Sequence, residues 1–149
     1  MAVGSARRTR YDGAGGLMNS ILVLDDDPLI RGLLAEWLEE AGYQVRQAQG
    51  VREALAATGP APLALTIVDI AAPKQGCAEV LEQLRRAHPD MPVIITSGCF
   101  VEGLGKATAV AKQLGADRVL AKPFSREDLL QAVHAVLGAP ARKAYDTQN

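Results

Sequence analysis

Four short hydrophobic runs each end on a polar residue, and this arrangement constrains the fold of the chain more than any other feature. Residues 21–24 run into Asp25, residues 63–68 into Asp69, residues 93–96 into Ser97 and residues 119–121 into Lys122. Short apolar runs rich in β-branched residues are typical of buried strands. If the runs are parallel strands of one sheet, these polar groups meet at the strand ends, where ligands bind in open α/β sheets.

The composition is that of a single globular domain. The length of 149 residues suits one domain, and 48% hydrophobic residues can form a core without disulfides or a structural metal. The formal net charge of -1 gives no general attraction to nucleic acid or to anionic membranes. No apolar run reaches the length of a membrane-spanning helix or resembles a signal peptide, so we expect a cytoplasmic protein without membrane association.

Both ends of the chain are expected to lie outside the folded domain. Residues 1–19 are rich in arginine and glycine without an apolar period, which indicates a disordered leader or a tag. The domain itself is predicted over residues 20–138, followed by a flexible tail of residues 139–149. The tail is too short for a second domain, so we expect either a stand-alone domain or one cut from a larger protein.

Helix signals alternate with the apolar runs. Asp27 followed by Pro28 is typical of a helix start, and Gly42 is typical of a left-handed residue after a helix end. Ser125 and Asp128 together resemble a capping box that opens the last helix. Other helices are predicted over residues 51–57, around residues 80–84 and near residues 106–114, and a short strand over residues 43–47. Alternating strands and helices predict a parallel sheet with helices on both faces.

The predicted strand ends carry groups that suit phosphoryl transfer. Asp25, Asp26 and Asp69 would repel one another if left unpaired, and a hard cation such as Mg²⁺ would remove that penalty. A carboxylate that remains accessible could then attack a phosphoryl group. The Lys122 ammonium and the Ser97 hydroxyl could bind the phosphoryl oxygens, whose charge must be neutralised during transfer.

Each of these residues also has an ordinary structural explanation. Acidic residues after a strand are common in turns, and Asp27 is best explained as the cap of the following helix. A single serine or lysine at a strand end is usually structural or solvated. The combination of all these residues in one order is therefore more informative than any one of them.

This order of residues resembles the receiver domain of bacterial two-component response regulators. The matching stretches are ILVLDDDP (21–28), LTIVDIAAP (65–73), PVIITSG (92–98) and AKPF (121–124). The resemblance implies a flavodoxin-like, doubly wound α/β fold whose five-stranded parallel sheet has the strand order 2-1-3-4-5. The first and third strands would then lie side by side where the strand order reverses.

The resemblance also implies a signalling role. Asp69 would accept a phosphoryl group from a sensor histidine kinase or a histidine phosphotransfer protein, and Ser97 and Lys122 would hold that group. The peptide bond between Lys122 and Pro123 would be cis. The domain would signal through a conformational change that a downstream protein target reads, without direct contact to nucleic acid. It would catalyse nothing beyond its own phosphorylation and dephosphorylation.

Mg²⁺ is the cofactor that the resemblance implies. Asp26 and Asp69 would bind the ion directly and Asp25 would bind it through water, while the backbone carbonyl of Ala71 would complete the protein ligands. Val119 departs from the family pattern, because an aromatic residue often stands three positions before the lysine. The turn over residues 73–76 is also shorter than usual.

Two other interpretations remain open from the sequence. Asp25 and Asp27 form an Asp-x-Asp motif like that of haloacid-dehalogenase-type phosphatases, although Leu29 stands where that motif has threonine or valine. A pseudo-receiver, which binds a partner protein without being phosphorylated, is the second alternative. The reaction of the chain with a small phosphodonor distinguishes all three.

Overall fold

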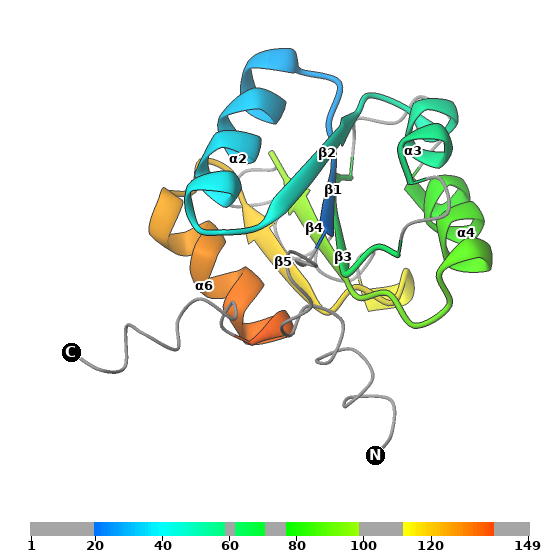
Figure 1. Cartoon of the computed structure of the whole chain (residues 1–149). Coiled ribbons are helices and arrows are strands. Elements are labelled where there is room, and N and C mark those ends of the chain that lie inside the picture. Colours follow the sequence, from blue (N-terminus) through cyan, green and yellow to red (C-terminus); the bar gives the residue numbers. More distant parts are fainter. Residues whose placement is uncertain (1–19, 59–61, 71–76, 99–111, 139–149) are drawn as a thin grey trace.

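The computed structural model describes residues 20–58, 62–70, 77–98 and 112–138 (Figure 1). The expected leader and tail, residues 1–19 and 139–149, lie outside the described residues. So do the turn over residues 73–76 and most of the helix expected near residues 106–114, of which Lys112 and Gln113 are described and helical.

The described residues form one sheet in which all neighbouring strands run parallel. The strands in chain order are β1 (Ser20–Leu24), β2 (Gln44–Ala48), β3 (Leu65–Asp69), β4 (Val93–Ser97) and β5 (Arg118–Ala121). Their order across the sheet is β2-β1-β3-β4-β5, which confirms the predicted doubly wound topology. β1 and β3 therefore lie side by side at the point where the strand order reverses.

Helices in the described part of the chain cover both faces of this sheet. They are α2 (Pro28–Glu40), α3 (Val51–Thr58), α4 (Cys77–Ala87) and α6 (Arg126–Leu137). Figure 1 shows α2 and α6 on one face and α3 and α4 on the other. Side chains of β1 alternate between the two faces of the sheet. Leu22 and Leu24 belong to the buried cluster under α3 and α4. Ile21 and Val23 belong to the buried cluster under α2 and α6. Burial on both faces explains why the central strands are continuous apolar runs.

The helix caps confirm the local predictions. The Asp27 carboxylate accepts hydrogen bonds from the backbone N–H groups of Leu29 and Ile30, so Asp27 is the N-cap of α2. Gly42, just after α2, has a φ of 105°, a conformation that favours glycine. Ser125 and Asp128 form the predicted capping box at the start of α6. None of the helices in the described ranges is long and apolar enough to cross a membrane.

The second strand begins one residue later than its predicted start. Tyr43 was expected to begin it, but the Tyr43 N–H donates to the carbonyl of Leu38 and therefore belongs to the closing turn of α2. The buried Tyr43 ring packs in the cluster under α2 and α6. Because the Tyr43 N–H bonds to the helix end, β2 begins at Gln44, where pairing with Ser20 of β1 starts.

Candidate functional site

The strand register brings the predicted site residues together at the carboxyl edge of the sheet. Leu24 of β1 pairs with Val68 of β3, so Asp25 and Asp69 extend from adjacent positions of neighbouring strands. At the other side of the site, the Lys122 N–H donates to the Ser97 carbonyl at 2.7 Å, directly after β5 ends. The ends of four strands therefore place Asp25, Asp69, Ser97 and Lys122 at one edge of the sheet, as the sequence predicts.

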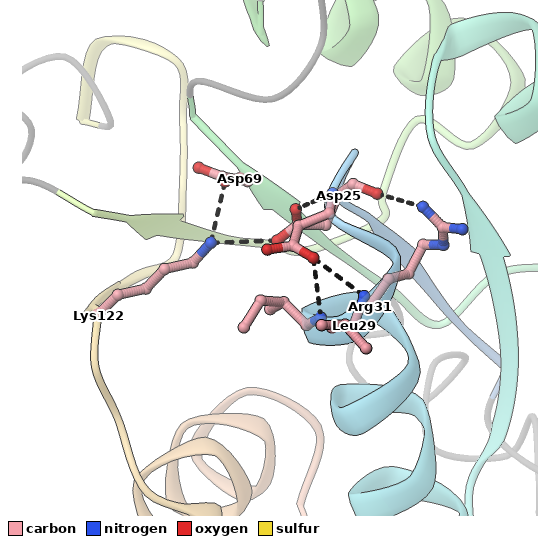
Figure 2. A network of polar contacts seen from close by, with 7 residues as sticks. Asp25, Leu29, Arg31, Asp69 and Lys122 are labelled. Carbon is pink, nitrogen blue, oxygen red and sulfur yellow. Dashed lines mark hydrogen bonds and ion pairs between the residues drawn. The ribbon is translucent and has the colours of Figure 1, made fainter.

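The Lys122 ammonium joins two of the carboxylates. Its Nζ lies 3.0 Å from Asp69 Oδ2 and 3.2 Å from Asp25 Oδ2 (Figure 2). The Asp25 side chain is 3% exposed and that of Asp69 is 13% exposed, so water screens this contact only weakly. Because two adjacent carboxylates repel, the shared ammonium offsets a charge that the fold would otherwise leave uncompensated.

The surroundings raise the pKa of Lys122. Burial is the largest single influence, and it acts to lower the pKa because it disfavours the charged form. The hydrogen bond and charge of Asp69, and then the charge and hydrogen bond of Asp25, together outweigh burial and raise the pKa above its ordinary value of 10.5. Lys122 is therefore a cation throughout the physiological pH range.

The Asp25 carboxylate is oriented by both of its oxygens. Oδ1 accepts a hydrogen bond from the Asp27 N–H at 2.9 Å, and Oδ2 accepts one from Lys122. The Asp27 side chain accepts hydrogen bonds from the first turn of α2, so it acts as the helix cap. Asp26, between them, is exposed to solvent. The turn after β1 thus divides its three carboxylates among a buried ion pair, an exposed position and a helix cap.

The donor atoms at this edge are of the kind that Mg²⁺ prefers. Carboxylate oxygens are the ligands that Mg²⁺ prefers, and Asp25 and Asp69 present two carboxylates on adjacent strands. In the described ranges, no three His, Cys, Asp or Glu side chains form a group that could hold a metal ion. Instead, the Lys122 ammonium binds both carboxylates. Ala71, the predicted carbonyl ligand, lies outside the described residues.

The other predicted features of the site lie at the ends of β4 and β5. The Ser97 side chain is completely buried at the end of β4. The peptide bond between Lys122 and Pro123 is cis, which confirms that prediction. Val119 is partly buried and packs against the cluster under α3 and α4.

Arg31 is a site residue that the sequence analysis did not identify. Its Nη1 donates to the backbone carbonyl of Asp25 at 2.7 Å, and its Nε donates to Gln47 Oε1 at 3.3 Å (Figure 2 shows the first contact). One signal was available in the sequence. Arg31 stands one helical turn after the cap Asp27, which places it above the end of β1.

A family model and several curated proteins match most of this chain. The family model for the response regulator receiver domain matches residues 21–134. The transcriptional regulatory protein CpxR of Klebsiella pneumoniae is 32% identical over 120 residues, which are 80% of this chain and 50% of that protein. The chain spans about half the length of the first curated relatives it matches.

Solved structures with the same fold include two bacterial response regulators. The chemotaxis response regulator CheY4 of Vibrio cholerae matches with a TM-score of 0.71 and 30% identity over 80% of this chain and 99% of that one. A response regulator protein from Burkholderia pseudomallei matches with a TM-score of 0.65 and 33% identity over 87% of this chain and 71% of that one. The latter structure holds a phosphorylated aspartic acid, a calcium ion and citrate.

The topology, the strand-end residues and these similarities lead to one assignment. The family match covers β1 through most of α6, which is nearly the whole described fold. The chain belongs to the response regulator receiver domain family of two-component signalling.

Proposed function

We propose that Asp69 accepts a phosphoryl group from a phosphohistidine on a sensor histidine kinase or a histidine phosphotransfer protein. The observation that carries this proposal is the position of the Lys122 ammonium, within hydrogen-bond distance of both Asp69 and Asp25. A cation beside the acceptor carboxylate is positioned to neutralise the charge that a transferred phosphoryl group brings.

In the proposed reaction, a carboxylate oxygen of Asp69 attacks the phosphorus atom of the phosphohistidine. The new oxygen–phosphorus bond forms as the phosphorus–nitrogen bond breaks, and the leaving imidazole nitrogen takes a proton from solvent. Lys122 then exchanges a carboxylate oxygen for a phosphoryl oxygen, and the Ser97 hydroxyl donates to another. Asp26, Asp69 and the Ala71 carbonyl would hold Mg²⁺ directly and Asp25 would hold it through water, and the ion would supply further positive charge at the phosphoryl oxygens.

The phosphorylated domain then signals to a downstream protein in the cytoplasm. Lys122 links Asp69 to the end of β5, so a change of its acceptor from carboxylate to phosphoryl alters the contacts between two strands. Two relatives named as transcriptional regulators, CpxR and NtrC, are about two and about four times as long as the matched region, respectively. We therefore assign to this domain the phosphoryl switch and not contact with nucleic acid.

Incubation with acetyl phosphate and Mg²⁺ tests the proposal against its alternatives. A receiver gains one phosphoryl group on Asp69 and releases phosphate slowly. Repeated turnover of phosphate esters, without a stable adduct, would instead identify a phosphatase of the haloacid-dehalogenase type. Neither adduct nor turnover would identify a pseudo-receiver and contradict the proposal.

A further inference from the structure

Arg31 and Lys122 approach Asp25 from opposite sides, and they hold different parts of it. Figure 2 shows Lys122 at the carboxylate and Arg31 at the backbone carbonyl. The distance from Arg31 Nη1 to the Asp25 carbonyl oxygen is 2.7 Å, shorter than either contact that Lys122 makes with a carboxylate. A second Arg31 nitrogen, Nε, donates to Gln47 of β2, so the guanidinium joins α2 and β2 to the end of β1.

These contacts fix the backbone on both sides of the Asp25 Cα. The Asp25 N–H donates to the Ala48 carbonyl of β2 at 3.2 Å, and the Asp25 carbonyl accepts from Arg31. One contact restricts rotation of the peptide group before the Cα and the other restricts the group after it. Because the direction of the Cβ atom follows from the backbone on both sides, Arg31 helps to set where the Asp25 carboxylate points.

Arg31 achieves this without occupying a carboxylate oxygen. Its two acceptors, the Asp25 carbonyl and the Gln47 amide oxygen, are neutral. Lys122 differs in this respect, because its ammonium binds one oxygen of Asp25 and one of Asp69. A cation that enters the site competes with Lys122 for those oxygens but not with Arg31.

We propose that Arg31 is a positioning residue that presets the Asp25 carboxylate and thereby strengthens Mg²⁺ binding by the unphosphorylated domain. The inference rests on the proposed function in one respect, because it takes Asp25 as a carboxylate that holds the ion through water. Mutation of a group that orients a metal ligand without touching the metal commonly lowers metal affinity by about 10–100-fold. Since Arg31 acts through the backbone, we expect its removal to weaken Mg²⁺ binding by about tenfold.

Three variants test the proposal. Each is titrated with Mg²⁺ alone, and calorimetry measures the dissociation constant. Arg31→Met keeps the long apolar stem but removes every donor, and we expect the dissociation constant to rise about tenfold. Arg31→Lys keeps the charge without the planar fork that serves two acceptors, so it should recover only part of the affinity. The control Arg126→Met removes the same charge from α6, where Arg126 pairs with Glu40 at 3.4 Å, and should bind Mg²⁺ like the wild type.

A measurement without metal tests the same contact independently. The Asp27 N–H donates to Asp25 Oδ1, so its amide hydrogen exchange reports the orientation of that carboxylate. In Arg31→Met without Mg²⁺, this exchange should accelerate more than that of the Leu29 N–H, which is bound by the Asp27 cap instead. Arg126→Met should change neither amide.

The outcomes separate failure of the inference from failure of the proposed function. Equal Mg²⁺ affinity and equal Asp27 exchange in wild type and Arg31→Met would overturn the positioning role. A fall in melting temperature alone, with unchanged affinity well below the melt, would also overturn it because it would assign Arg31 to stability. If the wild type itself neither binds Mg²⁺ nor is phosphorylated, the proposed function is overturned and the metal role of Arg31 with it.

Discussion

At the scale of single residues, Lys122 dominates the electrostatics of the site. It is the shared partner of Asp25, whose side chain is almost completely buried, and of Asp69, whose side chain is largely buried. Removal of one partner from such a group leaves the others with an uncompensated charge. The metal-free domain therefore depends on Lys122 for more than a later contact with a phosphoryl group.

Lys122→Met should destabilise the metal-free domain and make its stability more dependent on Mg²⁺. The lost hydrogen bonds to charged groups should cost about 1–2 kcal/mol of unfolding free energy, at the low end for such bonds because the ammonium is partly exposed. Mg²⁺ should then raise the melting temperature of the variant more than that of the wild type, since no ammonium competes for the carboxylates. Urea and thermal unfolding with EDTA and with Mg²⁺ measure both effects. Equal stabilisation of the two proteins by Mg²⁺ would contradict the competition.

The contribution of Lys122 to stability should disappear at alkaline pH. Because its pKa in the folded protein is raised above 10.5, the ammonium contributes fully below pH 10.5, and the contribution is lost as pH rises through the folded-state pKa. In EDTA, the unfolding free energies of wild type and Lys122→Met should therefore converge as pH rises above 10.5. A difference that stays constant across this range would assign the effect to packing instead of charge.

The residue contacts mark the limit of what the sequence alone could predict. The strand-end position of Lys122 was predictable, but its contact with Asp25 spans 97 positions and depends on the register of the sheet. The spacing of Arg31 from Asp27 indicates a position near the end of β1 but does not identify its acceptors, because both lie outside α2 and one is a backbone carbonyl. The sequence could thus predict which groups gather, but not how they pair.

At the scale of elements, the first turn of α2 is part of the site. The Asp27 side chain caps the N-terminus of α2, and the Asp27 N–H donates to the Asp25 carboxylate. The same residue therefore begins the helix and orients a site residue. Caps were predictable because they involve neighbouring residues with strong local preferences. The start of β2 was predicted one residue too early, because the Tyr43 N–H bonds to the Leu38 carbonyl in the turn that closes α2 at Gly42, so strand pairing begins only at Gln44.

Two cap variants should be equal in stability and unequal in Mg²⁺ binding. Asp27→Ala and Ser125→Ala each remove an N-cap side chain, from α2 and α6 respectively, and each should cost about 1 kcal/mol of unfolding free energy. Only the loosened α2 turn adjoins Asp25, so only Asp27→Ala should also weaken Mg²⁺ binding. Denaturant unfolding and Mg²⁺ titration of both variants check this. Equal loss of Mg²⁺ affinity in Ser125→Ala would show that the effect follows from stability alone.

At the scale of the whole molecule, the doubly wound topology explains why the site lies at this edge. The reversal of strand order places β1 beside β3, so Asp25 and Asp69 follow neighbouring strands at the same edge. The alternation of apolar runs and helices predicted the two-faced parallel sheet, whereas the particular strand order was implied by resemblance to the family. Alternation alone is compatible with several strand orders, because pairing of distant strands leaves no local trace in the sequence.

Identification of the phosphorylated residue decides whether Asp69 is the phosphoryl acceptor. The wild type and Asp69→Asn, which keeps the shape of the side chain but removes its anionic nucleophile, are incubated with acetyl phosphate and Mg²⁺. Both proteins should show the same far-ultraviolet circular dichroism, and intact-mass spectrometry should detect one added phosphoryl group on the wild type and none on Asp69→Asn. Phosphorylation of Asp69→Asn at an undiminished rate would contradict the assignment of Asp69 as the acceptor.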